Sequence, residues 1–353
     1  MPAPAACRGV KGDRVKSSMV FALLSAVAVG LLGCEKKAEE APRAGGENTP
    51  KSLRIAVVPK GTSHDYWKSV HAGALKAEKE LGGVEVTFRG PEREDDRDQQ
   101  ISLMQNIIAS KYDAIVLAPL DQAALVGPVR QAKEAGIPVV IIDSGLGAEA
   151  GKDFVSFVAT DNRAGGEMGG KHLGELLGGK GKVLLLRYME GSASTTEREE
   201  GFVSAISRYE GIQLVDLKRY AGATRATAQE AAENLLASQT DITGVFCPNE
   251  SSTFGMLLAL RSKGLAGNVR FVGFDASDAA VEALGQKQID ALVLQNPIRM
   301  GALGVTTVVE HLRGKAQPAT IDTGVALVTP ENMGSAEMKD LLSPDLASML
   351  GGR

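Results

Sequence analysis

Strand-like and helix-like segments alternate along most of this chain, and that alternation restricts the possible fold more than any other feature. Short apolar runs rich in Val, Ile and Leu are separated by stretches in which apolar residues recur with a helical period. The expected strands lie at 53–58, 84–88, 114–118, 139–142, 155–159, 183–186, 212–217, 245–247, 269–274 and 291–294. One helix is expected directly after residue 67. The others are expected at 98–110, 123–135, 163–177, 195–209, 224–237, 253–263, 279–286 and 300–313. Such alternation predicts an α/β fold with parallel sheets and right-handed crossovers.

The number of strand–helix units indicates two lobes. About ten units exceed what one open sheet of ordinary size holds, so we expect two doubly wound parallel sheets. Breaks at 160–162, at 296–297 and at Gly324 mark places where the chain could cross between lobes, because proline and polar residues interrupt strand pairing there. The resulting prediction is an N-terminal lobe of residues 53–160 plus 296–324, and a C-terminal lobe and tail of residues 161–295 plus 325–353. A three-segment hinge would leave a cleft between the two sheets.

The first residues have the pattern of an export signal. Positive charges at Arg8, Lys11, Arg14 and Lys16 precede an apolar run of 14 residues at 19–32. This run is shorter than the roughly 20 residues that a membrane-spanning helix needs, so a secretory segment is the expected interpretation.

The end of that run, Leu31-Leu32-Gly33-Cys34, resembles the lipobox of bacterial lipoproteins. The resemblance implies a signal peptide over residues 1–34, lipidation of Cys34 and a membrane contact through the lipid anchor only. An ordinary signal peptide or an uncleaved anchor is the alternative, and translation could start at Met1 or at Met19. Residues 35–52 are charged, contain Pro and Gly and lack large apolar side chains, which predicts a flexible tether.

Charge and cysteine content exclude some classes of function. The formal net charge is −4 and no basic cluster stands out, so no nucleic-acid partner is expected. Two of the three cysteines, Cys7 and Cys34, lie in the leader, which leaves no disulfide framework. Cys247 is expected to be a small buried side chain. No sequence motif indicates a metal or another cofactor.

Polar side chains recur where predicted strands end. Asp143, Asn249, Asp275 and Gln295 each follow or close a strand, and Arg198 lies early in a predicted helix. Ligands of open α/β sheets bind at the carboxyl ends of the strands. Carboxylates, amides and a guanidinium together donate and accept several hydrogen bonds, which suits a polyhydroxylated ligand.

A second group of candidates lies in the loop after the first strand. Tyr66 and Trp67 could cover the apolar face of a sugar ring, or they could be the first turn of a core helix. Lys60 and His64 are candidates for ligand contact in the same loop, although the local pattern favours exposed loop residues.

Structural alternatives exist for the strand-end residues as well. Asp143, Asp275 and Asn249 could each cap the helix that follows. Arg198 is surrounded by glutamates, so it could belong to a solvated helix face.

Six segments taken in order resemble one family. They are IAVVPKGTSHDYW at 55–67, AGIPVVIID at 135–143, VSFVATDNRAGGEMGG at 155–170, EGSASTTEREEGF at 190–202, GVFCPNESS at 244–252 and FVGFDAS at 271–277. From residue 53 to about residue 328 the chain resembles the type I periplasmic sugar-binding proteins, particularly the ribose-binding group of ABC importers. The resemblance implies two α/β lobes that close on a ligand.

The resemblance also implies roles for particular residues. Carried over by position, the polar ligand contacts are Asp143, Arg198, Asn249, Asp275 and Gln295, and the stacking aromatics are Tyr66 and Trp67. Lys60 and His64 occupy positions that are usually small or amide side chains. Two departures are expected to enlarge the pocket and to disfavour ribose: Ser144 replaces a second arginine, and Ala223 replaces a further aromatic residue.

The function implied is a monomeric solute-binding lipoprotein at the periplasmic or extracytoplasmic face, which captures a sugar or polyol for an ABC permease. A binding protein that serves a chemoreceptor or a sensor kinase is an alternative that the sequence does not separate. A carbohydrate-active enzyme could use Asp143 and Asp275 as a carboxylate pair, but no catalytic motif supports one. A LacI-type regulator would need a DNA-binding helix pair where the export signal lies.

Overall fold

The computed structural model describes residues 52–215 and 219–351, and all structural statements refer to these residues. The expected signal peptide, Cys34 and nearly all of the tether lie outside them.

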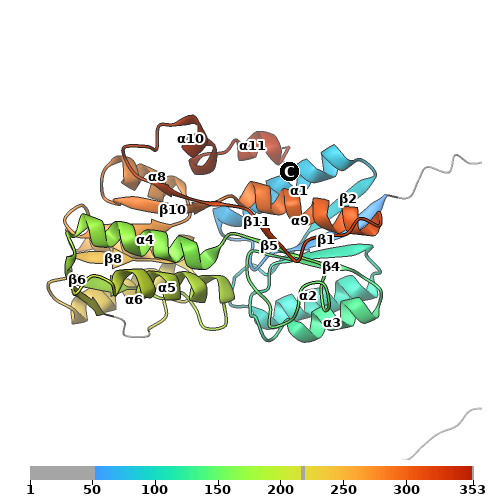
Figure 1. The fold of residues 1–353 in the computed structure, drawn as a ribbon, viewed down its shortest axis with the longest axis horizontal. Helices are drawn as coiled ribbons and strands as arrows, with labels where there is room; N and C mark the ends of the chain where they lie inside the picture. Colours follow the sequence, from blue (N-terminus) through green and yellow to red (C-terminus); the bar gives the residue numbers. More distant parts are fainter. Residues whose placement is uncertain (1–51, 216–218, 352–353) are drawn as a thin grey trace, which may run out of the picture. The chain divides into compact units, whose positions relative to one another are not determined.

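Two six-stranded sheets with the same strand arrangement form the framework (Figure 1). The first sheet has the order β11-β5-β4-β3-β1-β2, and the second has the order β12-β10-β9-β8-β6-β7. The strands of the first sheet are β1 (Leu53–Val58), β2 (Val84–Phe88), β3 (Ala114–Leu117), β4 (Val139–Ile142), β5 (Phe157–Ala159) and β11 (Thr320–Asp322). Those of the second are β6 (Lys180–Leu185), β7 (Gly211–Val215), β8 (Gly244–Phe246), β9 (Arg270–Phe274), β10 (Ala291–Gln295) and β12 (Val325–Val328). All pairings are parallel except that of β10 with β12, which confirms the predicted fold class.

Helices cover both faces of each sheet, because the strands are apolar on both faces. The helices are α1 (Asp65–Leu81), α2 (Arg97–Ala109), α3 (Val126–Glu134), α4 (Asn162–Leu176), α5 (Ala193–Ile206), α6 (Arg225–Ser238), α7 (Glu250–Ser262), α8 (Asp278–Gly285), α9 (Pro297–Leu312), α10 (Ala336–Leu342) and α11 (Leu346–Met349). Buried side chains form one core on each side of each sheet. Each sheet with its helices therefore has its own hydrophobic core.

Within the described residues the chain passes between the sheets three times. The passages follow β5, β10 and β11, and they lie beside the edge strands of both sheets. The hydroxyl oxygens of Thr160 and Thr323 lie 3.2 Å apart, which ties two of the passages together. We call this edge the hinge end.

The tail beyond residue 328 contacts both halves of the molecule. Leu342 of α10 is buried in the core of the second sheet, with Met338 and Leu341 packed beside it. The next helix, α11, packs against α1, which belongs to the first sheet. The tail thus spans the two sheets near the hinge end.

Close helix pairs place two parts of the candidate site. In the pair α4–α5, a Cβ atom added to Gly166 would lie 1.9 Å from the carbonyl oxygen of Arg198. In the pair α1–α9, a Cβ atom added to Gly301 would lie 2.0 Å from the carbonyl oxygen of Val70. Glycine is therefore needed at both contacts for the helices to approach this closely.

Gly301→Ala is expected to destabilise the protein by about 1–3 kcal/mol, because the added methyl group must push α9 away from α1. Urea unfolding followed by circular dichroism measures the change. Gly127→Ala is the matched control in α3: no heavy atom lies within 4 Å of its added Cβ atom, so this variant should be neutral or slightly stabilised. Equal stability of the two variants would contradict the packing argument.

Candidate functional site

Equivalent positions of the two sheets supply two carboxylates. Asp143 directly follows β4 and Asp275 directly follows β9, and these strands occupy the same place in their sheets. Both residues have left-handed backbone conformations, with φ of 64° and 65°, which Asp tolerates better than most residues. The shared strand position explains why the two side chains approach one another from opposite lobes.

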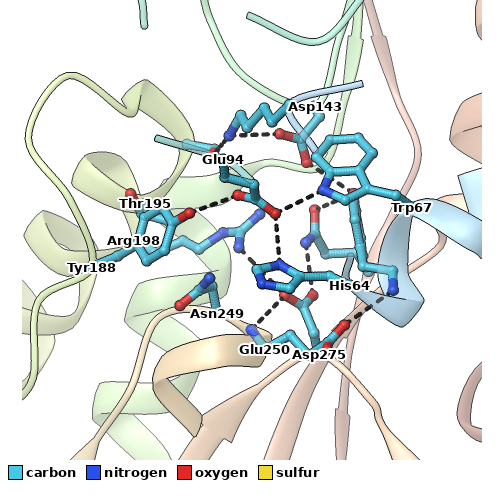
Figure 2. A pocket seen from close by; sticks show the side chains of 14 residues that line it. His64, Trp67, Glu94, Asp143, Tyr188, Thr195, Arg198, Asn249, Glu250 and Asp275 are labelled. Atoms are coloured by element: carbon cyan, nitrogen blue, oxygen red, sulfur yellow. Dashed lines mark hydrogen bonds and ion pairs between the residues drawn. The ribbon is translucent and has the colours of Figure 1, made fainter. Parts of the chain in front are cut away.

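All nine residues predicted from the sequence line one pocket between the lobes (Figure 2). They are Lys60, His64, Tyr66, Trp67, Asp143, Arg198, Asn249, Asp275 and Gln295. The space that remains between these side chains and at the opening of the pocket amounts to about 310 Å³.

Five further residues line the same pocket and were not among the predicted set: Glu94, Tyr188, Ser194, Thr195 and Glu250. Tyr188 follows β6, so the rule that found the other strand-end residues could have found it. Glu94 comes from the loop between β2 and α2, and no sequence pattern singles it out.

The expectation that Lys60 and His64 are exposed is wrong, since each is only 4% exposed. The Lys60 ammonium nitrogen lies 2.8 Å from Asp143 Oδ2 and 2.9 Å from the hydroxyl oxygen of Ser194. Ser194 lies in the first turn of α5 in the second lobe, so Lys60 connects the two lobes. A buried ammonium group needs such partners, and they explain its position.

Glu94 is the centre of a buried cluster, which we call the mouth cluster and which consists of Glu94, His64, Trp67 and Tyr188. The carboxylate accepts hydrogen bonds from Trp67 Nε1 and from the Tyr188 hydroxyl, both at 2.7 Å, and His64 Nδ1 lies 2.6 Å away (Figure 2). Burial alone would lower the pKa of His64 and raise that of Glu94. The facing opposite charges outweigh burial, so the pKa of His64 rises to about 9 and that of Glu94 falls to about 2.

Arg198 is 2% exposed, so the alternative of a solvated helix face is wrong. Its Nε donates to Asn162 Oδ1 at 2.8 Å, and its Nη1 donates to the carbonyl oxygen of Pro248 at 3.0 Å. The guanidinium also lies over the ring of Phe274, 4.2 Å from its centroid, and Nη1 is 3.9 Å from Asp275 Oδ2. These contacts fix the guanidinium against the pocket.

A hydrogen-bond chain links the remaining polar residues at the hinge end. Gln295 Nε2 donates to Asp275 Oδ1 at 2.8 Å, and the Tyr66 hydroxyl lies 2.9 Å from Asp143 Oδ1 and 3.3 Å from Gln295 Oε1. Burial raises the pKa of Asp275 to about 6, although the neighbouring Arg198 opposes that shift. These hydrogen bonds connect residues of the first lobe with residues of the second.

The sequence left two alternative roles open for some of these residues, helix capping and packing in the core, and the outcomes differ. Asn249 is the N-cap of α7, and its side chain accepts from Ser252 N, so the capping interpretation is confirmed even though Asn249 also lines the pocket. Neither Asp143 nor Asp275 caps the helix that follows it, because Asp161 is the N-cap of α4 and Ser277 is the N-cap of α8. Tyr66 and Trp67 begin α1 and belong to the core of the first sheet while they line the pocket, so both interpretations hold.

The expected enlargement of the pocket at positions 144 and 223 stays a prediction. Ala223 is buried, but it does not line the pocket, and the ring that comes from the second lobe belongs to Tyr188. Lys60, His64, Glu94 and Tyr188 line the pocket with large side chains. Large buried side chains therefore make the pocket narrow.

Two buried polar atoms in the pocket have no hydrogen-bond partner among the described residues. One is Arg198 Nη2, a donor from the second lobe, and the other is Asp143 Oδ2, an acceptor from the first lobe. Lys60 neutralises Asp143 Oδ2 as an ion pair but makes no directed hydrogen bond to it. A buried group without a partner is costly, so both atoms are suited to a ligand that can donate and accept.

Neither a metal site nor a membrane span is found in the part of the chain that the structure describes. No group of three or more His, Cys, Asp or Glu side chains there could hold a metal ion. No helix there combines the length and the apolar character that crossing a membrane requires.

The ion pair of the mouth cluster predicts how stability depends on pH. A folded-state pKa of about 9 for His64 lies above its ordinary value of 6.5, so its contribution is fully present below pH 6.5 and is lost as the pH rises through 9. We expect the free energy of unfolding to fall by about 3 kcal/mol over that range. Urea unfolding at pH 6.5 and pH 9 measures this loss. It should shrink markedly in His64→Asn and persist in His311→Asn, whose histidine is exposed. An equal loss in both variants would contradict the assignment.

Comparison with known proteins adds to this geometry. A family model described as a periplasmic binding protein domain matches residues 55–316. The D-ribose/D-allose-binding protein of Pseudomonas aeruginosa is 30% identical over 290 residues, which covers 80% of this chain and 90% of that protein.

Two solved structures resemble the fold along most of the chain. An ABC transporter solute-binding protein from Agrobacterium vitis with bound D-fucose is 36% identical, with a TM-score of 0.79, and the match covers 82% of this chain and 99% of that one. A carbohydrate transporter solute-binding protein from Agrobacterium radiobacter in complex with D-arabinose is 33% identical, with a TM-score of 0.79, and the match covers 84% of this chain and 100% of that one.

Proposed function

Because this chain belongs to the periplasmic binding protein domain family, we propose that it captures a sugar or sugar-like small molecule between its two lobes and delivers it to an ABC transporter. The similar proteins are described by monosaccharides that they bind, namely ribose, allose, fucose and arabinose, which supports a ligand of that size.

The two unpartnered atoms of the pocket carry this proposal. Arg198 Nη2 offers unused N–H groups from the second lobe, and Asp143 Oδ2 from the first, although ion-paired with Lys60, retains the capacity to accept a hydrogen bond. A sugar hydroxyl donates and accepts at once, so one ring with neighbouring hydroxyls can satisfy both atoms and bridge the lobes. The other predicted residues, Lys60, His64, Tyr66, Trp67, Asn249, Asp275 and Gln295, would complete the contact surface.

Closure of the lobes is the proposed mechanism of capture. The backbone N–H of Tyr66 donates to Glu250 Oε2 at 3.0 Å, and the Tyr188 hydroxyl donates to Glu94; each bond joins the two sheets. These bonds exist only when the lobes are closed. A ligand that contacts Asp143 and Arg198 together adds to them, and this differential affinity shifts the population toward the closed form.

We place the lobe limits at 53–160 plus 296–324 and at 161–295 plus 325–353, as expected from the sequence.

The cellular setting that we propose rests on the parts of the sequence outside the described residues. A lipid on Cys34 would hold a monomeric binding protein at the membrane surface while the tether lets it reach its permease. The protein would bind its ligand without transforming it.

A titration panel tests the function. Purified protein is screened with pentoses, hexoses, deoxysugars, polyols and nucleosides by thermal shift, and hits are measured by calorimetry. We expect at least one monosaccharide to raise the melting temperature and to be recovered unchanged after incubation. Failure of every sugar and polyol to bind, or conversion of the bound sugar into a product, would overturn the proposal.

A further inference from the structure

The tail beyond residue 328 has one end in each lobe. Its helix α10 belongs to the second lobe, where Leu342 is only 7% exposed and lies in the core of the second sheet. The next helix, α11, packs against α1 of the first lobe (Figure 1). Only residues 343–345 separate the two helices. The tail is therefore a short covalent connection between the lobes that lies outside the hinge passages, and also outside residues 55–316, which the family model matches.

The helix α11 contacts the first lobe with one apolar face. Leu346, Met349 and Leu350 are partly buried, whereas Ala347 and Ser348 are exposed. Residues spaced by three or four lie on the same side of a helix, so the three apolar side chains share the face that packs against α1. No residue of α11 is fully buried. A contact of this kind stabilises an arrangement of the lobes, but it can also break without unfolding either lobe.

Between α10 and α11 the tail passes over a cavity with walls from both lobes. The first lobe contributes the first two turns of α1, and the second lobe contributes residues 275–278 after β9. Residues of the tail cover this cavity, namely Leu341, Leu342, Ser343, Pro344 and Leu346. Tyr66, Asp275 and Gln295 line both this cavity and the ligand pocket. The tail thus bridges the gap between the lobes next to the ligand pocket.

The part of α1 that faces this cavity must move when the lobes separate. The backbone N–H of Tyr66 donates to Glu250 Oε2 at 3.0 Å. Beside it, Arg225 Nη2 donates to Asp65 Oδ2 at 3.1 Å. Both bonds tie the first turn of α1 to the second lobe, so they break as the lobes open and α1 moves away from α10. Because α10 stays with the second lobe, the three connecting residues must then stretch, or α11 must leave α1.

The connecting residues are folded into turns. The Ser343 N–H donates to the carbonyl oxygen of Lys339 at 2.9 Å. The Leu346 N–H donates to the carbonyl oxygen of Pro344 at 2.8 Å. Stretching the connection therefore costs hydrogen bonds as well as the contact of α11 with α1.

Building on the lobe closure of the proposed function, we propose that residues 343–351 form a strap that stabilises the closed form and restricts opening. The strap makes all of its contacts only when the lobes are closed, so it shifts the population toward that form before a ligand arrives. A ligand that needs the closed form is then bound more tightly and released more slowly.

Paired substitutions in α11 test the strap in the full-length protein. Leu346→Glu/Met349→Glu, the contact-face variant, places two charges on the face against α1. Ala347→Glu/Ser348→Glu places the same two charges on the exposed side of the same helix and is the matched control. A further variant ends the chain after Ser343, which removes nearly all of the strap and keeps the C-cap of α10. Circular dichroism verifies that each variant is folded, and the truncated chain decides the test if the contact-face variant unfolds.

The amide hydrogen of Tyr66 reports on closure without any ligand. It lies in the first turn of α1, where an amide has no partner inside the helix, and its hydrogen bond goes to Glu250 across the gap. Hydrogen exchange of the ligand-free protein, followed by mass spectrometry, therefore measures how often the lobes part.

We expect exchange at Tyr66 to be at least about threefold faster in the contact-face variant and in the truncated chain than in the wild type. Small-angle X-ray scattering should give a larger radius of gyration for the ligand-free contact-face variant. With a sugar found in the screen, both strap variants should bind about three- to tenfold more weakly, mainly through faster dissociation. The matched control should equal the wild type in each measurement.

The outcomes keep the two proposals apart. Faster exchange and a larger radius in the contact-face variant, with wild-type values in the control, support the strap whether or not a sugar has been found. Wild-type exchange in both the contact-face variant and the truncated chain overturns the strap and leaves the proposed function in place. Equal acceleration in the control also overturns it, because charge anywhere on α11 would then suffice. If no sugar or polyol binds, the proposed function falls, and the exchange rates still decide whether the tail holds the lobes together.

Discussion

Arg198→Ala is expected to weaken sugar binding by roughly 100-fold, because it removes charge-assisted hydrogen bonds that no neighbouring side chain can replace. Nη2 is the donor without a partner, and Nε and Nη1 are held by Asn162 and Pro248, so the guanidinium is already oriented before a ligand arrives. Removal of this side chain also leaves Asp275 without its nearest cation. Asp275 lines the same pocket beside Arg198, so we expect Asp275→Ala to reduce affinity for the sugar to a similar degree.

Calorimetric titration with the sugar identified by the screen measures these losses. Arg198→Lys keeps the positive charge but lacks the planar fork, and we expect it to recover only part of the affinity. Arg163→Ala is the control for a nearby arginine, since that side chain is exposed and pairs with Glu200 on the surface. Circular dichroism confirms that each variant is folded. Wild-type affinity in folded Arg198→Ala would refute the site.

Glu94→Ala is expected to reduce the free energy of unfolding by about 3–5 kcal/mol, the range found when one member of a buried ion pair is removed. The change removes the counterion that raises the pKa of His64, so burial then favours the neutral imidazole, and it deprives Trp67 and Tyr188 of their acceptor. It also removes the bond between the lobes at the mouth. Chemical unfolding near pH 7 measures the loss, and sugar titration of the same variant reports on closure.

A neighbouring carboxylate provides the control for Glu94. Asp95 pairs with Arg93 at the surface, so Asp95→Ala should change stability by no more than about 0.5 kcal/mol. The double variant Glu94→Ala/His64→Leu should recover part of the loss, because it also removes the buried imidazole that has lost its partner. Equal losses in Glu94→Ala and Asp95→Ala would show that the cluster carries no special stabilisation.

Much of the fold was predictable, because strands buried on both faces leave a continuous apolar signal. Short edge strands do not: β11 and β12 were not expected, since Thr320–Asp322 is largely exposed and Val325–Val328 is only partly buried. The two short tail helices were missed for a related reason, as their contacts with distant elements decide their position. The segment at 123–135 was expected to be one helix, but α3 begins only at Val126.

The candidate site was predictable wherever a strand end places the side chain. Asp143, Asp275 and Gln295 follow that rule, and the structure brings them together. Burial of Lys60 and His64 was not predictable, because it depends on partners that are distant in the sequence: Lys60 bonds to Ser194, and His64 pairs with a carboxylate from another loop. Glu94 was missed because its loop has no periodic pattern, and only the folded chain shows that the loop reaches the mouth.

The late position of β11 and β12 has a consequence for how the protein is made. The outer edge of β5 in the first sheet is paired only by Thr320–Asp322, and that of β10 in the second sheet only by Val325–Val328. A chain that emerges from its N-terminus, whether from the ribosome or across a membrane, therefore keeps β5 and β10 as additional unpaired edges until nearly all of its length is available. Neither sheet reaches its full number of strands before residue 320, and a premature stop there would leave β5 and β10 as exposed edges that favour aggregation.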